Sequence, residues 1–185
     1  MNSLKWITAI DNATTSYTET FGALSPDELN WKPNPYVWSI AQNIDHVITL
    51  NSTYYPIINK IRSGEYQVPF IGKIGFMADY FGKLILKSVQ PDTTKKIKTF
   101  PVWEPQSGEI SPDILERFES SQTELKGLIN NSQDLLDENI VISSPANKFI
   151  VYRLDKAFDI IVAHEYRHLE QAKGVLGILP NRTTT

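Results

Sequence analysis

The stretch "LDKAFDIIVAHEYRHLEQ", residues 154–171, carries the pattern H-E-x-x-H within a segment whose apolar residues recur at helical spacing. We expect the last helix of the chain to run from about residue 154 to 178, after a loop that contains Pro145. Residues four apart lie one above the other on a helix, so the imidazoles of His164 and His168 can approach the same metal ion. The stretch therefore predicts a helical chain with two candidate metal ligands on its final helix.

Apolar residues keep the helical spacing upstream of this stretch. A first helix is expected to stop at Gly22; its apolar stripe is Leu4, Ile7, Ile10, Tyr17 and Phe21. Ser39 and Gln42 have the spacing of a capping box, which predicts a second helix over residues 40–62 that is kinked at Pro56. Ser111, followed by a proline, is the expected N-cap of a third main helix that reaches about Asn131.

The segment between the second and third main helices, residues 65–110, is the least regular part of the sequence. It contains one expected helix at about 76–88, followed by a proline-punctuated run without a sustained period. Strands are not excluded at the short β-branched runs "NIVIS" and "KFIVY", but two isolated runs are not expected to make a sheet. We therefore predict an all-α fold, a four-helix bundle with a long crossover connection between the second and third main helices. No repeat or composition break divides residues 1–185, so a single domain is expected.

Composition limits the classes of function. The formal net charge is −3 and the chain has no basic stripe, so nucleic acid is not an expected partner. The N-terminus lacks an apolar signal segment, and "AFDIIVA" is far shorter than the roughly 20 residues that span a bilayer, so we expect a cytoplasmic protein without a membrane partner. There is no cysteine, which excludes disulfides and thiolate ligands. Any thiol chemistry must use a thiol from outside the chain.

H-E-x-x-H is best known from zinc proteases, but this sequence lacks the third ligand that such enzymes need. After His168 the only acidic residue is Glu170, no further histidine follows, and Gln171 stands where an extended protease motif requires glycine. The chain has one other histidine, His46, in the predicted second helix. If His46 joined His164 and His168, the site would have three protein ligands and an open position, which is the form of a catalytic site.

The segment "LSPDELNWKPNPYVWSIAQNIDHV", residues 24–47, together with residues 154–171, resembles the DinB-like, YfiT-like superfamily of metal-dependent proteins. The likeness covers most of the chain in order: a Trp-Ser start to the second helix, a histidine seven residues after that serine, and H-x-x-x-H in the last helix. The resemblance implies a four-helix bundle, frequently a homodimer, that binds a divalent ion such as zinc or nickel at His46, His164 and His168. Some members of the superfamily are S-transferases that use a low-molecular-weight thiol.

Three functional hypotheses follow. The first is a divalent-metal-dependent enzyme that transfers a small thiol to a small-molecule substrate. The second is a metal-dependent hydrolase in which Glu165, about 100° round the helix from His164, handles protons; the competing interpretation of Glu165 is a surface or ion-paired residue. The third is a non-catalytic metal-binding stress-response protein. An open, water-accessible coordination position beside a pocket would favour an enzyme.

Further candidates surround the histidines. Arg167 and Arg153 could bind a carboxylate on the thiol or the substrate, although arginines on a helix surface are usually just solvated. The residues that could orient the ligating imidazoles are Asp159, Asp45 and Glu170. Four aromatic residues are expected to serve in core or interface packing rather than in a substrate pocket; they are Trp31, Trp38, Trp103 and Tyr54.

Overall fold

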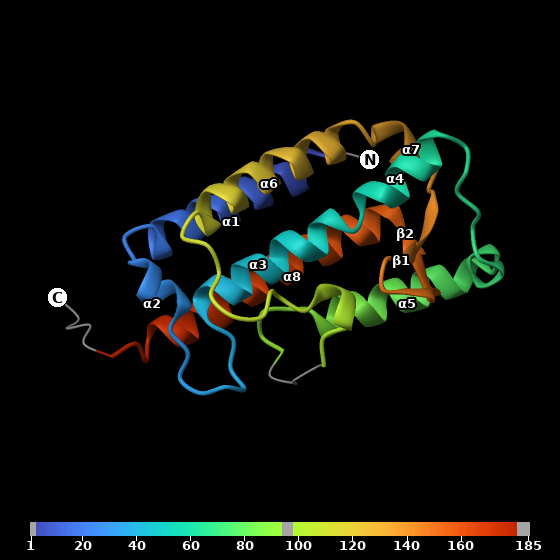
Figure 1. The fold of residues 1–185 in the computed structure, drawn as a ribbon. Coiled ribbons are helices and arrows are strands. Elements are labelled where there is room, and N and C mark those ends of the chain that lie inside the picture. The colour runs from blue at the N-terminus through green and yellow to red at the C-terminus, as the bar shows by residue number, and fades with distance from the viewer. Residues whose placement is uncertain (1–2, 94–97, 181–185) are drawn as a thin grey trace.

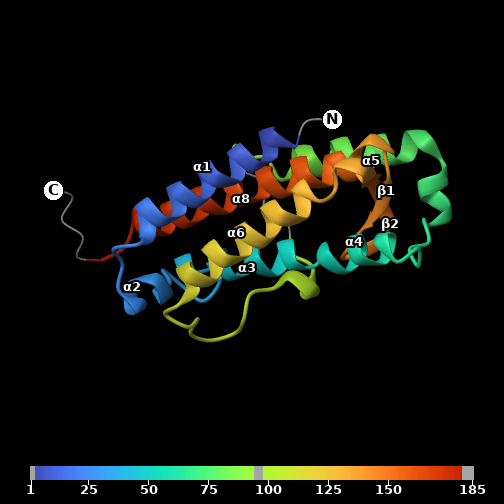
Figure 2. The same cartoon turned by 90° about the horizontal axis from the view of Figure 1, so that it is seen from above.

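The computed structural model describes residues 3–93 and 98–180, and four long helices form its body. These are α1 (Leu4–Phe21), α3 (Ile40–Ser52), α6 (Ile114–Asn130) and α8 (Leu154–Leu176). Helix α3 contacts α6 and α8, and α1 contacts the same two helices, as the two views show (Figures 1 and 2). The predicted all-α bundle is confirmed. Part of the expected crossover, residues 94–97, lies outside the described residues.

The start of α3 is fixed by the capping box that the sequence predicts. The hydroxyl of Ser39 accepts a hydrogen bond from the main-chain N–H of Gln42, and the Gln42 side chain accepts one from the N–H of Ser39. Such a cap contributes about 1 kcal/mol to helix stability. A similar box at Ser25 and Glu28 begins the short helix α2 (Pro26–Asn30). The box stabilises the first turn of α3, the helix that packs against α8 and carries His46.

The second main helix is divided in two, where the sequence predicts one kinked helix. Helix α3 ends at Ser52, and α4 (Tyr55–Arg62) follows after a break at Thr53 and Tyr54. Pro56 lies in the first turn of α4. Proline has no N–H to donate, and the first turn is the place where a helix needs none, so the chain restarts there instead of bending.

The crossover contributes a helix that covers one side of the bundle. Helix α5 (Gly75–Ser88) packs against α8 and strand β2 (Asn147–Arg153), as Figure 1 shows. A Cβ atom at Gly82 would lie 3.2 Å from Cγ of Lys156 and 3.4 Å from Cβ of Tyr152, so glycine allows this close approach. Two short 3₁₀ turns, Phe70–Lys73 and Pro101–Trp103, flank the helix in sequence.

Two predictions about the second half of the chain are wrong. Helix α6 begins at Ile114 after Asp113, without a side-chain cap, so Ser111 is not its N-cap. The two β-branched runs form a sheet, because β1 (Val141–Ser144) pairs antiparallel with β2 through a turn in which Ser144 accepts a hydrogen bond from the N–H of Ala146. The hairpin is preceded by the short helix α7 (Gln133–Asp137) and buries Ile142, Val151 and Tyr152. Packing against the bundle, rather than further strands, stabilises this hairpin.

The buried apolar residues form two clusters along the bundle. One includes Phe158 and Ile161 of α8, and the other includes Leu169 and Ala172 of the same helix. Between them, α8 carries three buried polar side chains, His164, Glu165 and His168. The interior of the bundle is therefore interrupted by a polar layer, and the candidate site lies there. Over the described ranges, no helix has the length and apolar character needed to cross a membrane.

Candidate metal centre

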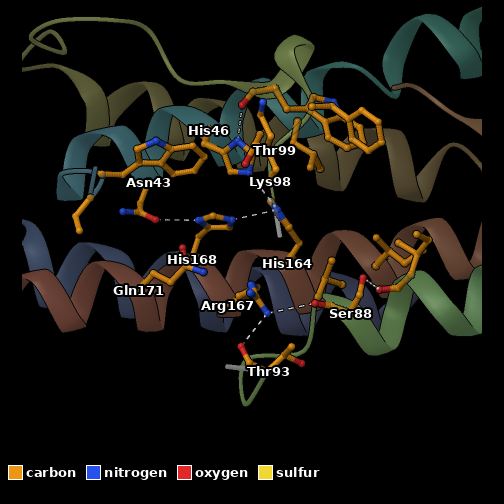
Figure 3. A pocket seen from close by; sticks show the side chains of 18 of the residues that line it. Asn43, His46, Ser88, Thr93, Lys98, Thr99, His164, Arg167, His168 and Gln171 are labelled. Carbon is orange, nitrogen blue, oxygen red and sulfur yellow. Dashed lines mark hydrogen bonds between the residues drawn. The ribbon is translucent and has the colours of Figure 1, made fainter. Parts of the chain in front are cut away.

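Helices α3 and α8 bring the three histidines together. His46 comes from the second turn of α3, and His164 and His168 lie one turn apart on α8. The Nε2 atom of His164 is 3.1 Å from Nε2 of His46 and 3.1 Å from Nε2 of His168 (Figure 3). All three side chains are buried, and their candidate ligand atoms lie within 4.8 Å of one another. The structure thus assembles the set of three residues expected from the sequence.

Hydrogen bonds fix two of the rings. The Nδ1 atom of His46 donates to the main-chain carbonyl of Trp103, which can only accept. The Nδ1 atom of His168 lies 2.9 Å from Oδ1 of Asn43, whose Nδ2 donates to the carbonyl of Ser39. With Nδ1 as the donor, Nε2 of each neutral ring carries a lone pair that points into the cluster. The acceptors expected from the sequence, Asp45, Asp159 and Glu170, do not have this role.

The three histidines cannot satisfy all of their hydrogen-bonding groups among themselves, because one N–H donor is missing. His164 can offer at most one N–H from Nε2, whereas two lone pairs face it, and its own Nδ1 has no hydrogen-bond partner among the described residues. A cation placed between the three Nε2 atoms would meet every lone pair at once, and neutral imidazole is a common ligand of divalent transition metals. The residues therefore fit a divalent metal ion.

Burial keeps these imidazoles in the form that binds metal. It lowers the pKa of His46, and it lowers the pKa values of His164 and His168 well below the usual range, with smaller contributions from the neighbouring imidazoles and from Arg167. A histidine must be neutral to ligate, so a metal ion would not have to displace protons at neutral pH.

A cavity of about 860 Å³ adjoins the histidine cluster. Its walls come from α3, α8, the crossover and the hairpin, and Figure 3 shows Lys98 and Thr99 of the crossover beside the histidines. Trp38, Trp103 and Tyr54 line the cavity, and of these Tyr54 also belongs to a buried apolar cluster against which Trp103 packs, so packing and a cavity wall are combined in them. The fourth, Trp31, packs against one of the buried apolar clusters, as expected.

Two tryptophans contact His46, one through its ring and the other through its main-chain carbonyl. The ring of Trp38 lies 4.9 Å from that of His46 and stacks at 5.9 Å on His168. Trp103 supplies the carbonyl that accepts from His46, while its indole N–H donates to Oγ1 of Thr53 at 3.1 Å. No sequence pattern could indicate a main-chain acceptor, because a carbonyl is present at every residue and only the fold selects one.

The side chain of Glu165 lies away from the histidine cluster, although Glu165 follows His164 in the sequence. Its side chain is fully buried in the interior of the bundle, where Oε1 accepts hydrogen bonds from Nδ2 of Asn51 at 2.6 Å and Nε2 of Gln122 at 3.0 Å. Burial raises the pKa of Glu165 to about 7, against the lowering effect of these two bonds. It is neither a surface residue nor one of the residues that line the cavity.

The two arginines have structural partners. Arg167 lines the cavity, and its Nη1 donates to the carbonyls of Ser88, Gln90 and Thr93, which ties the end of α5 to α8 (Figure 3). Arg153 is paired with Asp79 of α5. Arg167 is therefore a residue that positions a wall of the cavity.

The acidic candidates are also engaged elsewhere. Asp45 accepts from the N–H of Gln106 and from Arg117. Asp159 accepts from the indole of Trp6 and from two lysines, and Glu170 accepts from a lysine one turn away. These contacts hold the crossover and the helices in place. The hydrogen bonds from the Nδ1 atoms of His46 and His168 are accepted instead by the carbonyl of residue 103 and by Asn43.

A helical bundle with three buried, converging histidines beside a cavity defines a class, the all-α proteins equipped to bind a metal ion between two helices. The family model of the DinB superfamily matches residues 9–172, and the chain belongs to that superfamily. Comparison with curated proteins and with solved structures found no match.

Proposed function

We propose that this protein is a divalent-metal-dependent enzyme that transfers a small thiol to an electrophilic small molecule. The observation that supports it most directly is the position of three neutral, converging imidazoles at the side of a cavity of about 860 Å³. Closed structural zinc sites have four protein ligands, whereas sites with three leave a position for a substrate or a cosubstrate. A site of a non-catalytic metal-binding protein would need no such cavity.

The residues of the site would have two roles, to hold the ion and to orient the ligating rings. His46, His164 and His168 would hold the ion, with zinc and nickel as the candidates, and Asn43 and the carbonyl of residue 103 would orient two of the rings. A divalent ion in this place would lower the pKa of a bound thiol or water. In the transfer, the thiol proton goes to solvent, the sulfur forms a bond to carbon of the electrophile, and the leaving group departs with its bonding electrons.

Thiol transfer is favoured over hydrolysis by the cavity itself. No aspartate or glutamate lines it among the described residues, and Glu165, the candidate general base of a hydrolase, accepts from Asn51 and Gln122 instead. An ordinary thiol has a pKa of about 8.5, compared with about 15.7 for water, so a thiol needs less help to become an anion. The absence of cysteine in the chain requires that this thiol comes from outside.

The test begins with elemental analysis of untagged wild type and His46→Ala. We expect about one equivalent of divalent metal in the wild type and its loss in the variant. S-transfer is then measured with cysteine as the probe thiol and a fluorogenic alkyl halide as the electrophile. Lys173→Ala, an exposed change on α8, is the control and should keep both metal and activity. Metal without S-transfer for a range of thiols would overturn the transferase proposal and leave the binding protein.

The remaining predictions concern the assembly and its setting. The resemblance implies a homodimer, and we propose that state for this chain, to be checked by light scattering on the purified protein. A cytoplasmic location likewise stays a prediction, to be checked by fractionation of cells that produce the protein.

A further inference from the structure

The cavity extends from buried lining residues to exposed ones, and we use the name closed end for the part that is lined by the buried side chains of Leu50, Tyr54, Tyr152 and Ile160. Its closed end begins one helical turn from the metal-ligand candidates, because Leu50 follows His46 by four residues and Ile160 precedes His164 by four. At the opposite end the lining residues Tyr36 and Ile178 are 96% and 59% exposed. A ligand that enters from the exposed end would pass the histidines before it reached the closed end.

The lining of the closed end is apolar. We use the name apolar compartment for the seven residues of the lining that surround it, from α3, α5, β2, α8 and the segments that adjoin them: Leu50, Tyr54, Ile85, Val89, Ile150, Tyr152 and Ile160. None of them is charged. They come from elements that pack together, since α5 contacts both β2 and α8.

The two phenol groups of the compartment have hydrogen-bond partners at its wall, each other and, for Tyr152, the side chain of Ser144. The hydroxyls of Tyr54 and Tyr152 form a hydrogen bond of 2.9 Å, and both residues are buried. Burial also raises the pKa of Tyr152 to about 12, so this phenol stays neutral at physiological pH. The compartment therefore offers a polar ligand little that is not already used, and it offers an apolar ligand a surface from which water is readily displaced.

Size gives the second argument. Ligand cavities commonly measure about 300–1,000 Å³, and this one is near the upper part of that range. An ion and a small thiol would fill only a part of it. Charged and amide side chains of the lining, such as Lys98 and Gln171, lie outside the apolar compartment, while Ser144 adds one hydroxyl beside Tyr152, to which it is hydrogen-bonded. The cavity thus has separate places for a polar cosubstrate and for an apolar group.

We propose that the apolar compartment binds the alkyl or aryl tail of an amphipathic substrate, about six to ten carbons long, whose reactive end lies at the three histidines. This inference rests on the proposed function for the identity of the reactive end, but the tail site itself does not require metal. The substrate class is then a medium-chain or aromatic electrophile rather than a small polar one.

The experiment measures binding of n-alkyl hydroxamates from two to ten carbons to zinc-loaded and to metal-stripped protein by calorimetry. The hydroxamate head binds a metal with an open position, while the tail reports on the compartment. We expect the Kd to fall about three- to fourfold for each added methylene group in both forms. Zinc should lower the Kd by the same factor at every chain length.

Two variants that fill the compartment and one control locate the tail. In Val89→Trp and Ile150→Trp, the Kd should cease to fall at a shorter chain length than in wild type. The two-carbon hydroxamate should bind the zinc-loaded variants with the same Kd as wild type. Leu84→Trp, on α5 at a position that is 48% exposed and absent from the lining, should leave the whole series unchanged. Retention of stoichiometric zinc shows that each variant is folded.

The outcomes separate the two proposals. A Kd that does not depend on chain length, with the gain from zinc preserved, would overturn the apolar compartment and leave the metal site standing. Dependence on chain length without a gain from zinc would support the compartment and contradict the open metal site. If the filling variants and Leu84→Trp behaved alike, the tail would lie elsewhere and the inference would be wrong.

Discussion

His164 and Glu165 are neighbours in sequence and both are buried, yet they belong to two different regions of the molecule. His164 faces the cavity with two other histidines, and its Nδ1 has no hydrogen-bond partner among the described residues. Glu165 faces the interior, where Asn51 and Gln122 donate to it. Successive residues on a helix point about 100° apart, so one motif can serve a site on one face and the packing of the bundle on another. A motif therefore names candidate residues, and the face that each one occupies decides its role.

The largest difference between the two regions should appear in metal affinity. Removal of one of three ligands, as in His164→Ala, should weaken binding by about 1,000-fold or more. Glu165→Gln keeps the shape of the side chain and makes no contact with the cluster, so it should change affinity less than about threefold. Competition with a chelator measures both. Equal losses in the two variants would contradict the separation of the regions.

The next largest effect should be the dependence of stability on pH at Glu165. Its pKa is about 7 in the folded protein, above the ordinary value of 4.5. As pH rises from 4.5 to 7, the unfolded chain loses this proton while the folded chain keeps it. The free energy of unfolding therefore falls by about 3 kcal/mol, and this fall is complete above pH 7. Glu165→Gln lacks this titration.

Urea unfolding of the metal-free proteins at pH 4.5–8 measures the effect as the difference between wild type and Glu165→Gln. The buried histidines act in the opposite direction, since their lowered pKa values cost stability as pH falls below about 6.5, but they are present in both proteins and cancel. A flat difference between wild type and Glu165→Gln would mean that Glu165 is ionised in the folded protein.

Asn43 allows a subtler change on the cavity side. Asn43→Ala removes the acceptor of Nδ1 of His168 and should weaken metal binding about 10- to 100-fold. Gln42→Ala, one residue away, breaks the capping box instead and should cost about 1 kcal/mol of stability with unchanged metal affinity. If the two variants had the same metal affinity, the orientation of His168 would not depend on Asn43.

The smallest expected effect lies on the interior side. The hydroxyl of Tyr17 donates to the main-chain carbonyl of Glu165 at 3.0 Å. Tyr17→Phe should reduce the free energy of unfolding by about 1 kcal/mol, because the carbonyl keeps the shape of its surroundings but loses a donor. Metal content should be unaffected. A loss of metal in this variant would show that the interior side supports the ligands as well.

The sequence predicted the cluster of three histidines better than its surroundings. Spacing of four residues pairs His164 with His168, and the scarcity of histidines leaves His46 as the third, so these residues follow from local geometry and elimination. The partner of His46 is a carbonyl 57 residues away in an irregular segment, which no periodic pattern indicates. The same limit explains the hairpin, because the pairing of β1 with β2 depends on packing against α5 and the bundle. Local rules place helices and faces, whereas contacts distant in sequence require the assembled fold.

The bond from His46 to residue 103 has a consequence for how the protein tolerates substitution. Because the acceptor belongs to the main chain, any residue that keeps the backbone in place at position 103 preserves the orientation of the imidazole. The side chain of Trp103, which lines the cavity, is free of that constraint. A descendant of this sequence could therefore exchange this wall of the cavity while it inherits the arrangement of the three histidines unchanged.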